Sequence, residues 1–365
     1  AILIIFMWLA NDLVTAKEYA NKRNFTEPLF VFAIMVVAGS KPILHFATQL
    51  LYKLGKGLQF ILRTKQAPTL YFLTLSITPL LGSLITEPAA MTLAAFLLRD
   101  LVYRHKCSTP LLFGTLGVLF VNISIGGTLT NFAAPPVLMV ASTWGWSTAF
   151  MFANFGLEAT IAIFINATIA TLIFHKQLIE PTSKSDHVRI PLTITAIHLL
   201  FLLGIVGFAH DPVIFMWLLL FFIGYTTAYP KHQNPLILRE ALLVGFFLGG
   251  LVVLGGLQGW WLQPILETMS PTAVFYGSMA LTAITDNAAL TYLGSLVQGT
   301  SPEFKLALVG GAVAGGGVTG IANAPNPAGL AILRSYFPNA VVSAGLLFVA
   351  AIPPTIVAIL ALRLL

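Results

Sequence analysis

Charged residues and cysteines are scarce in this sequence of 365 residues. Only 9% of its residues are charged and 57% are hydrophobic, whereas about a quarter of the residues in soluble domains are charged. This composition excludes an ordinary soluble domain. The single cysteine, Cys107, excludes an internal disulfide and a zinc site built from cysteines. Histidines such as His45 and His210 show no metal-ligand spacing, so we expect them in loops and interfaces.

Basic residues outnumber acidic residues and give the chain a net charge of +6. They lie in short stretches between long apolar runs, where basic residues orient a protein in its membrane. We therefore exclude nucleic acid as a partner and expect the lipid bilayer to surround most of the chain. The predicted fold class is an all-α polytopic membrane protein.

Long apolar runs predict the spanning helices, because a helix needs about 20 apolar residues to cross the hydrocarbon core. Residues 1–14 are shorter and are interpreted as the end of a helix, followed by a polar loop at residues 17–27. Residues 51–66 predict an amphipathic segment at the cytoplasmic surface. The apolar runs cover residues 28–51, 68–98, 111–140, 151–174, 191–208, 212–229, 236–257, 271–297, 304–334 and 346–362.

One motif occurs twice, near the centre of an apolar run in each half. Residues 85–92 are Ile-Thr-Glu-Pro-Ala-Ala-Met-Thr, and residues 284–291 are Ile-Thr-Asp-Asn-Ala-Ala-Leu-Thr. A charge at the centre of a membrane costs about 2.5–3.5 kcal/mol on insertion scales, so intramembrane acids usually serve a function. The repetition pairs Glu87 with Asp286 and disfavours a purely structural role for either acid.

Basic residues on both sides of the first motif predict a re-entrant hairpin, because both flanks then lie in the cytoplasm. Pro88 blocks a continuous helix at the tip. The second run lacks this basic excess, so its hairpin is predicted to enter from the outside and the two tips to face each other. The basic residues around the first run are Lys53, Lys56, Arg63, Lys65, Arg99, Arg104 and Lys106.

An interrupted helix follows each hairpin. Residues 124–131 (Ser-Ile-Gly-Gly-Thr-Leu-Thr-Asn) precede Pro135 and Pro136. Residues 315–320 (Gly-Gly-Gly-Val-Thr-Gly) precede residues 323–327 (Asn-Ala-Pro-Asn-Pro). Glycine, proline and polar residues at this depth predict discontinuous helices whose freed backbone groups line protein or water.

The same order of elements in both halves predicts two inverted-topology repeats, each with a re-entrant helical hairpin and a discontinuous transmembrane helix. The repeats are residues 1–174, whose N-terminal helix we expect to be incomplete, and residues 191–365. A polar cytoplasmic linker joins them at residues 175–190. Lys231 and Arg239 place a loop of the second repeat inside as well. Inverted repeats of this kind are typical of secondary transporters.

The hairpin tips and interrupted helices are expected to meet at the membrane midplane and form one site. No lysine or arginine accompanies the four motifs, so the two acids favour a cation or protons, and oxygen ligands suit a hard cation such as sodium. The predicted cation- and proton-binding residues are Glu87, Asp286, Asn287, Thr86 and Thr285. The predicted ligands from the interrupted helices are Thr130, Asn131, Thr319, Asn323 and Asn326. Sodium is assigned to Glu87, Asp286, Asn287, Asn131 and Asn323.

Desolvation and a neighbouring negative charge both favour protonation of a buried carboxylate. A site that must hold either a cation or protons to remain neutral therefore couples their exchange. Glu158 is a third intramembrane acid, and it is either a proton relay or a structural hydrogen-bond partner. No cofactor is expected apart from the transported Na⁺ and H⁺.

At these residues the chain resembles the ion transporter superfamily, which includes sodium/proton antiporters and sodium-coupled carboxylate transporters. The carboxylate importers carry Ser-Asn-Thr at the hairpin tips, whereas this chain has Thr-Glu-Pro at residues 86–88 and Thr-Asp-Asn at residues 285–287. The Asp-Asn pair is similar to the antiporter branch, and the Glu-Pro pair departs from it. The resemblance implies two hairpins and two unwound helices around a central site, an elevator-type movement and a homodimer.

These observations predict a secondary active transporter of a bacterial inner (plasma) membrane, namely a Na⁺/H⁺ antiporter that works by alternating access. The alternative is a sodium- or proton-coupled symporter of an organic anion of the di- or tricarboxylate type, with Asn131 and Asn323 holding the substrate. An intramembrane enzyme with two acids as general acid and base would not need inverted halves. A passive channel is a further alternative, and fluxes that saturate and depend on a counter-ion would argue against it. We therefore expect a transporter and not an enzyme.

Overall fold

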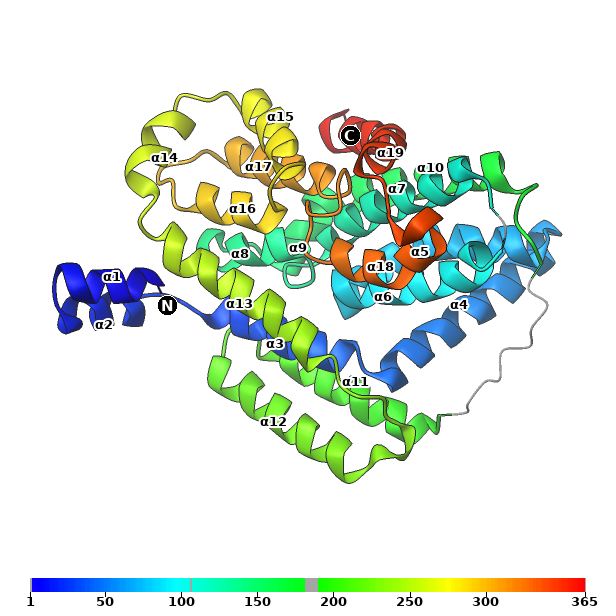
Figure 1. The fold of residues 1–365 in the computed structure, drawn as a ribbon, viewed down its shortest axis with the longest axis horizontal. Coiled ribbons are helices and arrows are strands. Elements are labelled where there is room, and N and C mark those ends of the chain that lie inside the picture. The colour runs from blue at the N-terminus through cyan, green and yellow to red at the C-terminus, as the bar shows by residue number, and fades with distance from the viewer. Residues whose placement is uncertain (1, 106, 181–189, 365) are drawn as a thin grey trace.

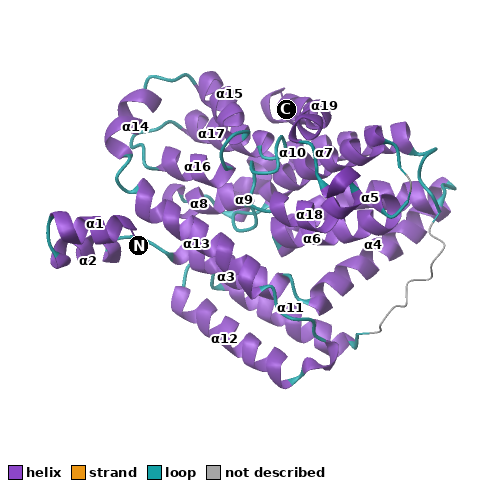
Figure 2. Cartoon of the chain, viewed as in Figure 1, coloured by secondary structure: helices purple, strands orange, loops and turns teal. Residues whose placement is uncertain are grey.

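The computed structural model describes residues 2–105, 107–180 and 190–364, and Figures 1 and 2 show that these ranges fold into helices joined by loops, without a strand. The all-α prediction is therefore confirmed. The helices before the central connection are α1 (Ile2–Ala10), α2 (Leu13–Asn21), α3 (Thr26–Ala38), α4 (Lys41–Leu62), α5 (Gln66–Ile85), α6 (Glu87–Leu98), η1 (Arg99–Tyr103), α7 (Thr109–Gly126), η2 (Gly127–Leu129), α8 (Pro135–Trp144), α9 (Thr148–Met151), η3 (Phe152–Gly156) and α10 (Leu157–Phe174).

The second half contains the remaining helices. They are α11 (Leu192–Gly207), α12 (Pro212–Ala228), η4 (Pro230–His232), α13 (Leu238–Gly255), α14 (Gly259–Leu266), α15 (Pro271–Thr282), α16 (Asn287–Ser295), α17 (Pro302–Gly315), α18 (Asn326–Leu333), η5 (Arg334–Tyr336), η6 (Pro338–Ala340) and α19 (Ala344–Leu364). Residues 181–189 of the predicted linker lie outside the described residues.

Five helices in the described ranges are long and apolar enough to cross a membrane, or six if α3 and α4 form one bent span. Large apolar side chains such as Trp217, Phe221 and Phe246 are exposed on α12 and α13. A water-soluble monomer rarely exposes so much apolar surface, whereas lipid covers it without cost. The helices thus agree with a polytopic membrane protein.

The start of the chain differs from the prediction. Residues 17–27 were expected to be a loop, but α2 runs to Asn21 and α3 already begins at Thr26. Asp12 explains the extra helix, because its carboxylate accepts a hydrogen bond from the amide of Thr15 (2.8 Å) and caps α2. A break after residue 38 divides the apolar run of residues 28–51, and α4 leaves it at an angle of 65° to α3.

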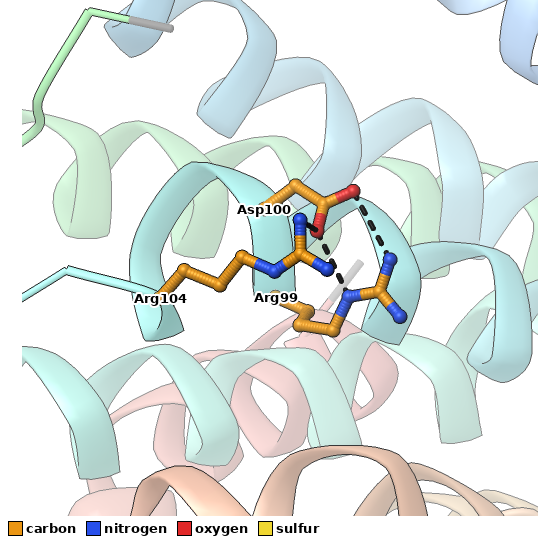
Figure 3. Close-up of polar contacts among 3 residues, drawn as sticks. All are labelled: Arg99, Asp100 and Arg104. Carbon is orange, nitrogen blue, oxygen red and sulfur yellow. Dashed lines mark hydrogen bonds and ion pairs between the residues drawn. The ribbon is translucent and has the colours of Figure 1, made fainter. Parts of the chain in front are cut away.

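Helices α5 and α6 fold back on each other around Thr86. Tyr71 near the start of α5 and Tyr103 in η1 belong to the same hydrophobic cluster, so the two outer ends of the pair lie together. The outer end carries an ionic cluster, shown in Figure 3, in which Asp100 lies between two arginines. Asp100 contacts Arg99 Nε at 2.8 Å and Arg104 Nη1 at 3.1 Å. Arg99 and Arg104 belong to the basic flank that follows the first motif.

The helices form two groups that pack against each other, and one cluster of buried residues, which includes Ile85, Ala89 and Ala288, joins them. In the first, α3 packs against α11, α12 and α13 around buried phenylalanines such as Phe30 and Phe222, and Figure 1 shows these helices along one side of the molecule. We call this group the scaffold. The second contains α5 to α10 and α15 to α19, and its core includes Phe120 and Val313.

Packing within the second group follows one plan in both halves. Helix α5 packs against α7, and α15 packs against α17. The short helices after the interruptions pack across the halves, with α8 against α16 and α18 against α6. This crossed arrangement brings both tips and both interruptions to the centre of the group.

Candidate cation site

The first tip consists of one non-helical residue, Thr86, between α5 and α6. Its φ of 77° is rare for a β-branched residue, and such a conformation costs about 1–3 kcal/mol. The amide of the next residue, Glu87, donates to the carbonyl of Ala133 in the first interruption (3.4 Å). Pro88 occupies the first turn of α6, as expected for a residue that stops the preceding helix. The turn places Glu87 in the protein interior, where it is fully buried.

The second tip lies between α15 and α16, and Asp286 caps α16. One carboxylate oxygen, Oδ1, accepts hydrogen bonds from the amides of Ala288 (2.8 Å) and Ala289 (3.1 Å). The amide of Asn287 donates to the carbonyl of Ala322 in the second interruption (3.1 Å). Asn287 is fully buried, whereas Asp286 is 9% exposed. The cap holds the Asp286 carboxylate at a helix N-terminus, which favours negative charge.

The two tips make the same backbone contact one residue apart in the repeated motif. Glu87 and Asn287 each donate an amide hydrogen to the interruption of their own half, and Thr86 and Asp286 are the residues that precede α6 and α16. The motif itself pairs Glu87 with Asp286 through its shared Ile, Thr and Ala-Ala residues. By backbone contact, the counterpart of Glu87 is therefore Asn287.

Glu87 contacts the opposite half directly. The side-chain amide of Asn323, in the second interruption, donates to Oε2 of Glu87 at 2.8 Å, and both residues are 0% exposed. A hydrogen bond from an uncharged donor to a buried carboxylate stabilises its charged form. The first tip and the second interruption thus form one polar centre.

Two glycines let the interrupted helices approach the tips closely. A Cβ atom at Gly127 would collide with the Glu87 carboxyl group, and one at Gly316 would lie 2.8 Å from Nδ2 of Asn287. Neither position can carry a larger side chain unless the tip residue moves. The glycine-rich motifs therefore act through backbone proximity.

Several buried oxygens at this centre have no hydrogen-bond partner among the described residues. A buried polar atom without a partner costs about 1–3 kcal/mol, and such atoms commonly mark a bound ion or water. Carboxylate, amide and hydroxyl oxygens are the ligands that hard cations prefer. The unpartnered oxygens are Thr86 Oγ1, Glu87 Oε1, Asn287 Oδ1, Asn323 Oδ1 and Asn326 Oδ1.

A cavity of about 680 Å³ reaches this centre from the scaffold side. Asp286, Thr285 and Asn323 line it together with Pro88. Asn323, which donates to Glu87, thus connects the buried first tip to the cavity that Asp286 lines.

The whole chain, residues 1–365, matches the sequence model of a protein family described as "Putative Na+/H+ antiporter". The chain belongs to this antiporter family. No individually curated protein matches it. Family membership and the apolar helices together identify an integral membrane protein of the cation/proton antiporter type, which agrees with the expectation of a transporter and not an enzyme.

Four of the ten predicted ligands of this antiporter-family chain have their side chains engaged elsewhere. Each of the threonine hydroxyls donates to a backbone carbonyl: Thr130 to Ser83 (2.8 Å), Thr319 to Ala283 (2.9 Å) and Thr285 to Leu281 (2.7 Å). The Asn131 amide donates to the carbonyl of Trp146 (3.0 Å) and accepts from Thr148 (2.8 Å). Asn131 therefore points toward α9 and is not brought to Glu87.

The side-chain amide of Asn326 has a nitrogen that forms structural hydrogen bonds and an oxygen that has no described partner. Its amide nitrogen donates to the carbonyls of Gly316 and Thr319, both at 2.8 Å, and so holds the second interruption together. Its Oδ1 atom remains buried without a partner. Glu158 lies on α10, and its Oε2 atom is also buried without a partner among the described residues. No described contact joins Glu158 to the tips.

Metal clusters of the usual kind are absent from the described residues, because no group of three or more His, Cys, Asp or Glu side chains comes together there. The groups that could hold a cation are the carboxylates of Glu87 and Asp286 and the amide oxygens beside them. Sequence reasoning overlooked Ser83, which donates to Gly126 O (2.7 Å) and accepts from Leu129 N (3.0 Å). Ser83 lies three residues before Thr86, and this closeness to the tip was the signal in the sequence that could have identified it.

Proposed function

We propose that this antiporter-family chain exchanges Na⁺ for H⁺ at one central site formed by Glu87, Asp286, Asn287, Asn323 and Asn326. The observation that carries the proposal is the set of five buried oxygens without described partners on the two tips and the second interruption, one of which is Oε1 of Glu87. A cation supplies the missing partner for such oxygens, and two acids without a basic neighbour supply its counter-charge.

Proton coupling follows from the burial of the carboxylates. A buried carboxylate must be neutralised by a cation or by a proton, because an unpaired charge in a low-dielectric site is costly. Sodium binding therefore requires the release of protons, and protonation releases sodium. Glu87 and Asp286 lie at the N-termini of α6 and α16. The positive end of a helix dipole stabilises a negative charge, so both carboxylates can still ionise.

Alternating access by inverted repeats is the movement that we propose for this exchange. The paired contacts of α5 with α7 and α15 with α17, and the crossed contacts of α8 with α16 and α18 with α6, support two related halves. The site lies in one packed group, and the scaffold of α3 and α11 to α13 forms another. An elevator-type movement would shift the first group along the scaffold.

The cavity favours a cation over an organic anion as the transported species. Its charged lining residues among the described ones, Asp286 and Glu240, are both acidic. An anion would meet repulsion there, so we do not propose the symporter alternative. A homodimer in a bacterial inner membrane remains a prediction from the sequence.

Reconstitution in liposomes tests this function. The purified protein is placed in vesicles that contain a pH-sensitive dye, a proton gradient is imposed, and sodium, lithium or potassium is added. We expect cation-driven proton movement in the wild type and its loss in Glu87→Gln and Asp286→Asn. Both substitutions keep the side-chain shape, and asparagine still caps α16.

The control is Glu18→Gln, which removes an exposed acid of α2. It should leave the exchange unchanged. If no cation moves protons in the wild type, the antiport proposal fails, and proton or sodium uptake driven by an organic acid would then support the symporter alternative. If exchange persists in both carboxylate variants, the site assignment fails.

A further inference from the structure

Glu240 shares a cavity with Asp286 although the two residues belong to different groups of helices. Glu240 lies in the first turn of α13 in the scaffold, and Asp286 caps α16. Both line the cavity of about 680 Å³, and they are its only charged residues among the described lining. The rest of the lining is apolar apart from Thr285 and Asn323. The described lining therefore carries two negative charges and no basic side chain.

The deep end of this cavity is built to receive a ligand. Asn323 lines it, is fully buried, and holds the Glu87 carboxylate through its amide. Its Oδ1 atom has no partner among the described residues. The shallow end is different, because Glu240 is exposed and takes part in no ion pair within the described ranges. The cavity thus leads from an exposed acid to a buried, oxygen-rich centre.

Glu240, the exposed charged residue of the cavity lining, lies next to a basic connection of the scaffold. Glu240 directly follows Arg239, and Lys231 lies in the same connection between α12 and α13. In Figure 1 the chain enters α13 at the end of the scaffold where α11 begins, after the central connection. The positive-inside rule predicts that this connection, and Glu240 with it, lies on the cytoplasmic side.

We infer that Glu240 recruits the transported cation at the cytoplasmic mouth of the Asp286 cavity. This inference rests on the proposed function and adds a scaffold residue to it. A negative charge at the mouth of a cleft with low-dielectric walls raises the local concentration of cations. In this inference Glu240 does not bind the cation in the loaded state. Its charge should therefore change the apparent affinity with which a cation enters the cavity. It should not change the rate of exchange once the carrier is loaded.

The test measures exchange from the cytoplasmic side in inside-out vesicles, at low and at high ionic strength. At low ionic strength we expect Glu240→Gln to raise the apparent KM for sodium about two- to seventeenfold, the range that the charge–charge energy at ~10 Å gives for effective dielectric constants between about 80 (water) and about 20 (a protein surface). Glu240→Lys should raise it further. The maximal rate should stay unchanged, and salt should remove most of the difference through screening.

Glu303→Gln is the matched control. Glu303 is also an exposed acid in the first turn of a helix, α17, but it does not line the cavity. A loss of helix-dipole stabilisation affects both variants alike, whereas cation recruitment affects Glu240→Gln alone.

The outcomes separate the two ideas. An unchanged KM in both Glu240 variants, an effect that salt does not reduce, or an equal effect in Glu303→Gln would overturn the inference while the antiport of the wild type stands. A wild type that shows neither cation-driven proton movement nor sodium-dependent thermal stabilisation in detergent would overturn the proposed function and this inference with it.

Discussion

Substitution of Asn323 by alanine tests the polar centre most sharply. Its amide is the one described donor to Glu87, at 2.8 Å, and both side chains are fully buried. A hydrogen bond to a charged group contributes about 1.5–3 kcal/mol. Since each 1.4 kcal/mol is about a tenfold change in a binding constant, Asn323→Ala should weaken sodium binding about 10- to 100-fold. The loss of Oδ1 as a ligand acts in the same direction.

The same substitution should alter the competition between sodium and protons. The hydrogen bond favours the charged form of Glu87, to which the proposed exchange assigns sodium binding, over the protonated form. Removal of the hydrogen bond therefore weakens sodium binding more than proton binding. The pH of half-maximal exchange should then become more alkaline. The sodium dissociation constant can be measured by radiolabelled sodium binding to the purified protein at several pH values.

Asn131→Ala provides the matched control, because Asn131 is also an asparagine of an interruption but its amide contacts Trp146 and Thr148. Its sodium affinity should stay within about threefold of the wild type, since the change removes no ligand of Glu87. Equal losses in Asn131→Ala and Asn323→Ala, or an unchanged affinity in Asn323→Ala, would refute the assignment of Asn323.

Three further substitutions separate site geometry, stability and proton transfer. Gly127→Ala places a methyl group against Glu87 and should reduce exchange at least about tenfold, at an overpacking cost of about 1–3 kcal/mol, whereas Gly277→Ala has room and should be neutral in the same vesicle assay. Asn122→Ala leaves buried groups of α5 and α10 without partners, so thermal unfolding in detergent should show a loss of about 1–3 kcal/mol with sodium affinity retained. Glu158→Gln should slow exchange without weakening sodium binding if Glu158 relays protons, and unchanged exchange would assign it a structural role.

The helical architecture was predictable because a helix that crosses a lipid bilayer requires a long run of apolar residues. Apolar runs identified the helices, and the interruptions fell where glycine, proline and amide residues cluster, as at Gly127 and Pro135. Helix α2 was missed because its stability depends on one capping residue, Asp12, and not on apolar length. Hydropathy also says nothing about which helices pack together, so the crossed pairing of α6 with α18 came only from the structure.

The site was predictable in its residue types and less so in its geometry. Glu87, Asn287 and Asn323 stood out because polar groups are costly inside a membrane. The one-residue shift between the tips was hidden, since it depends on which amide reaches which carbonyl. Asn131 was assigned to the wrong neighbours for the same reason. Glu240 gave no signal, because an exposed acid beside a loop is ordinary until a cavity connects it to Asp286.

Proton release upon sodium binding tests the central claim most directly. Sodium is added to the purified protein in weakly buffered detergent solution, and the released protons are followed with a pH dye in the wild type, Glu87→Gln and Asp286→Asn. Competition at the paired carboxylates predicts that sodium releases protons from the wild type and fewer from each variant. Sodium binding without proton release, or equal release from all three proteins, would contradict it.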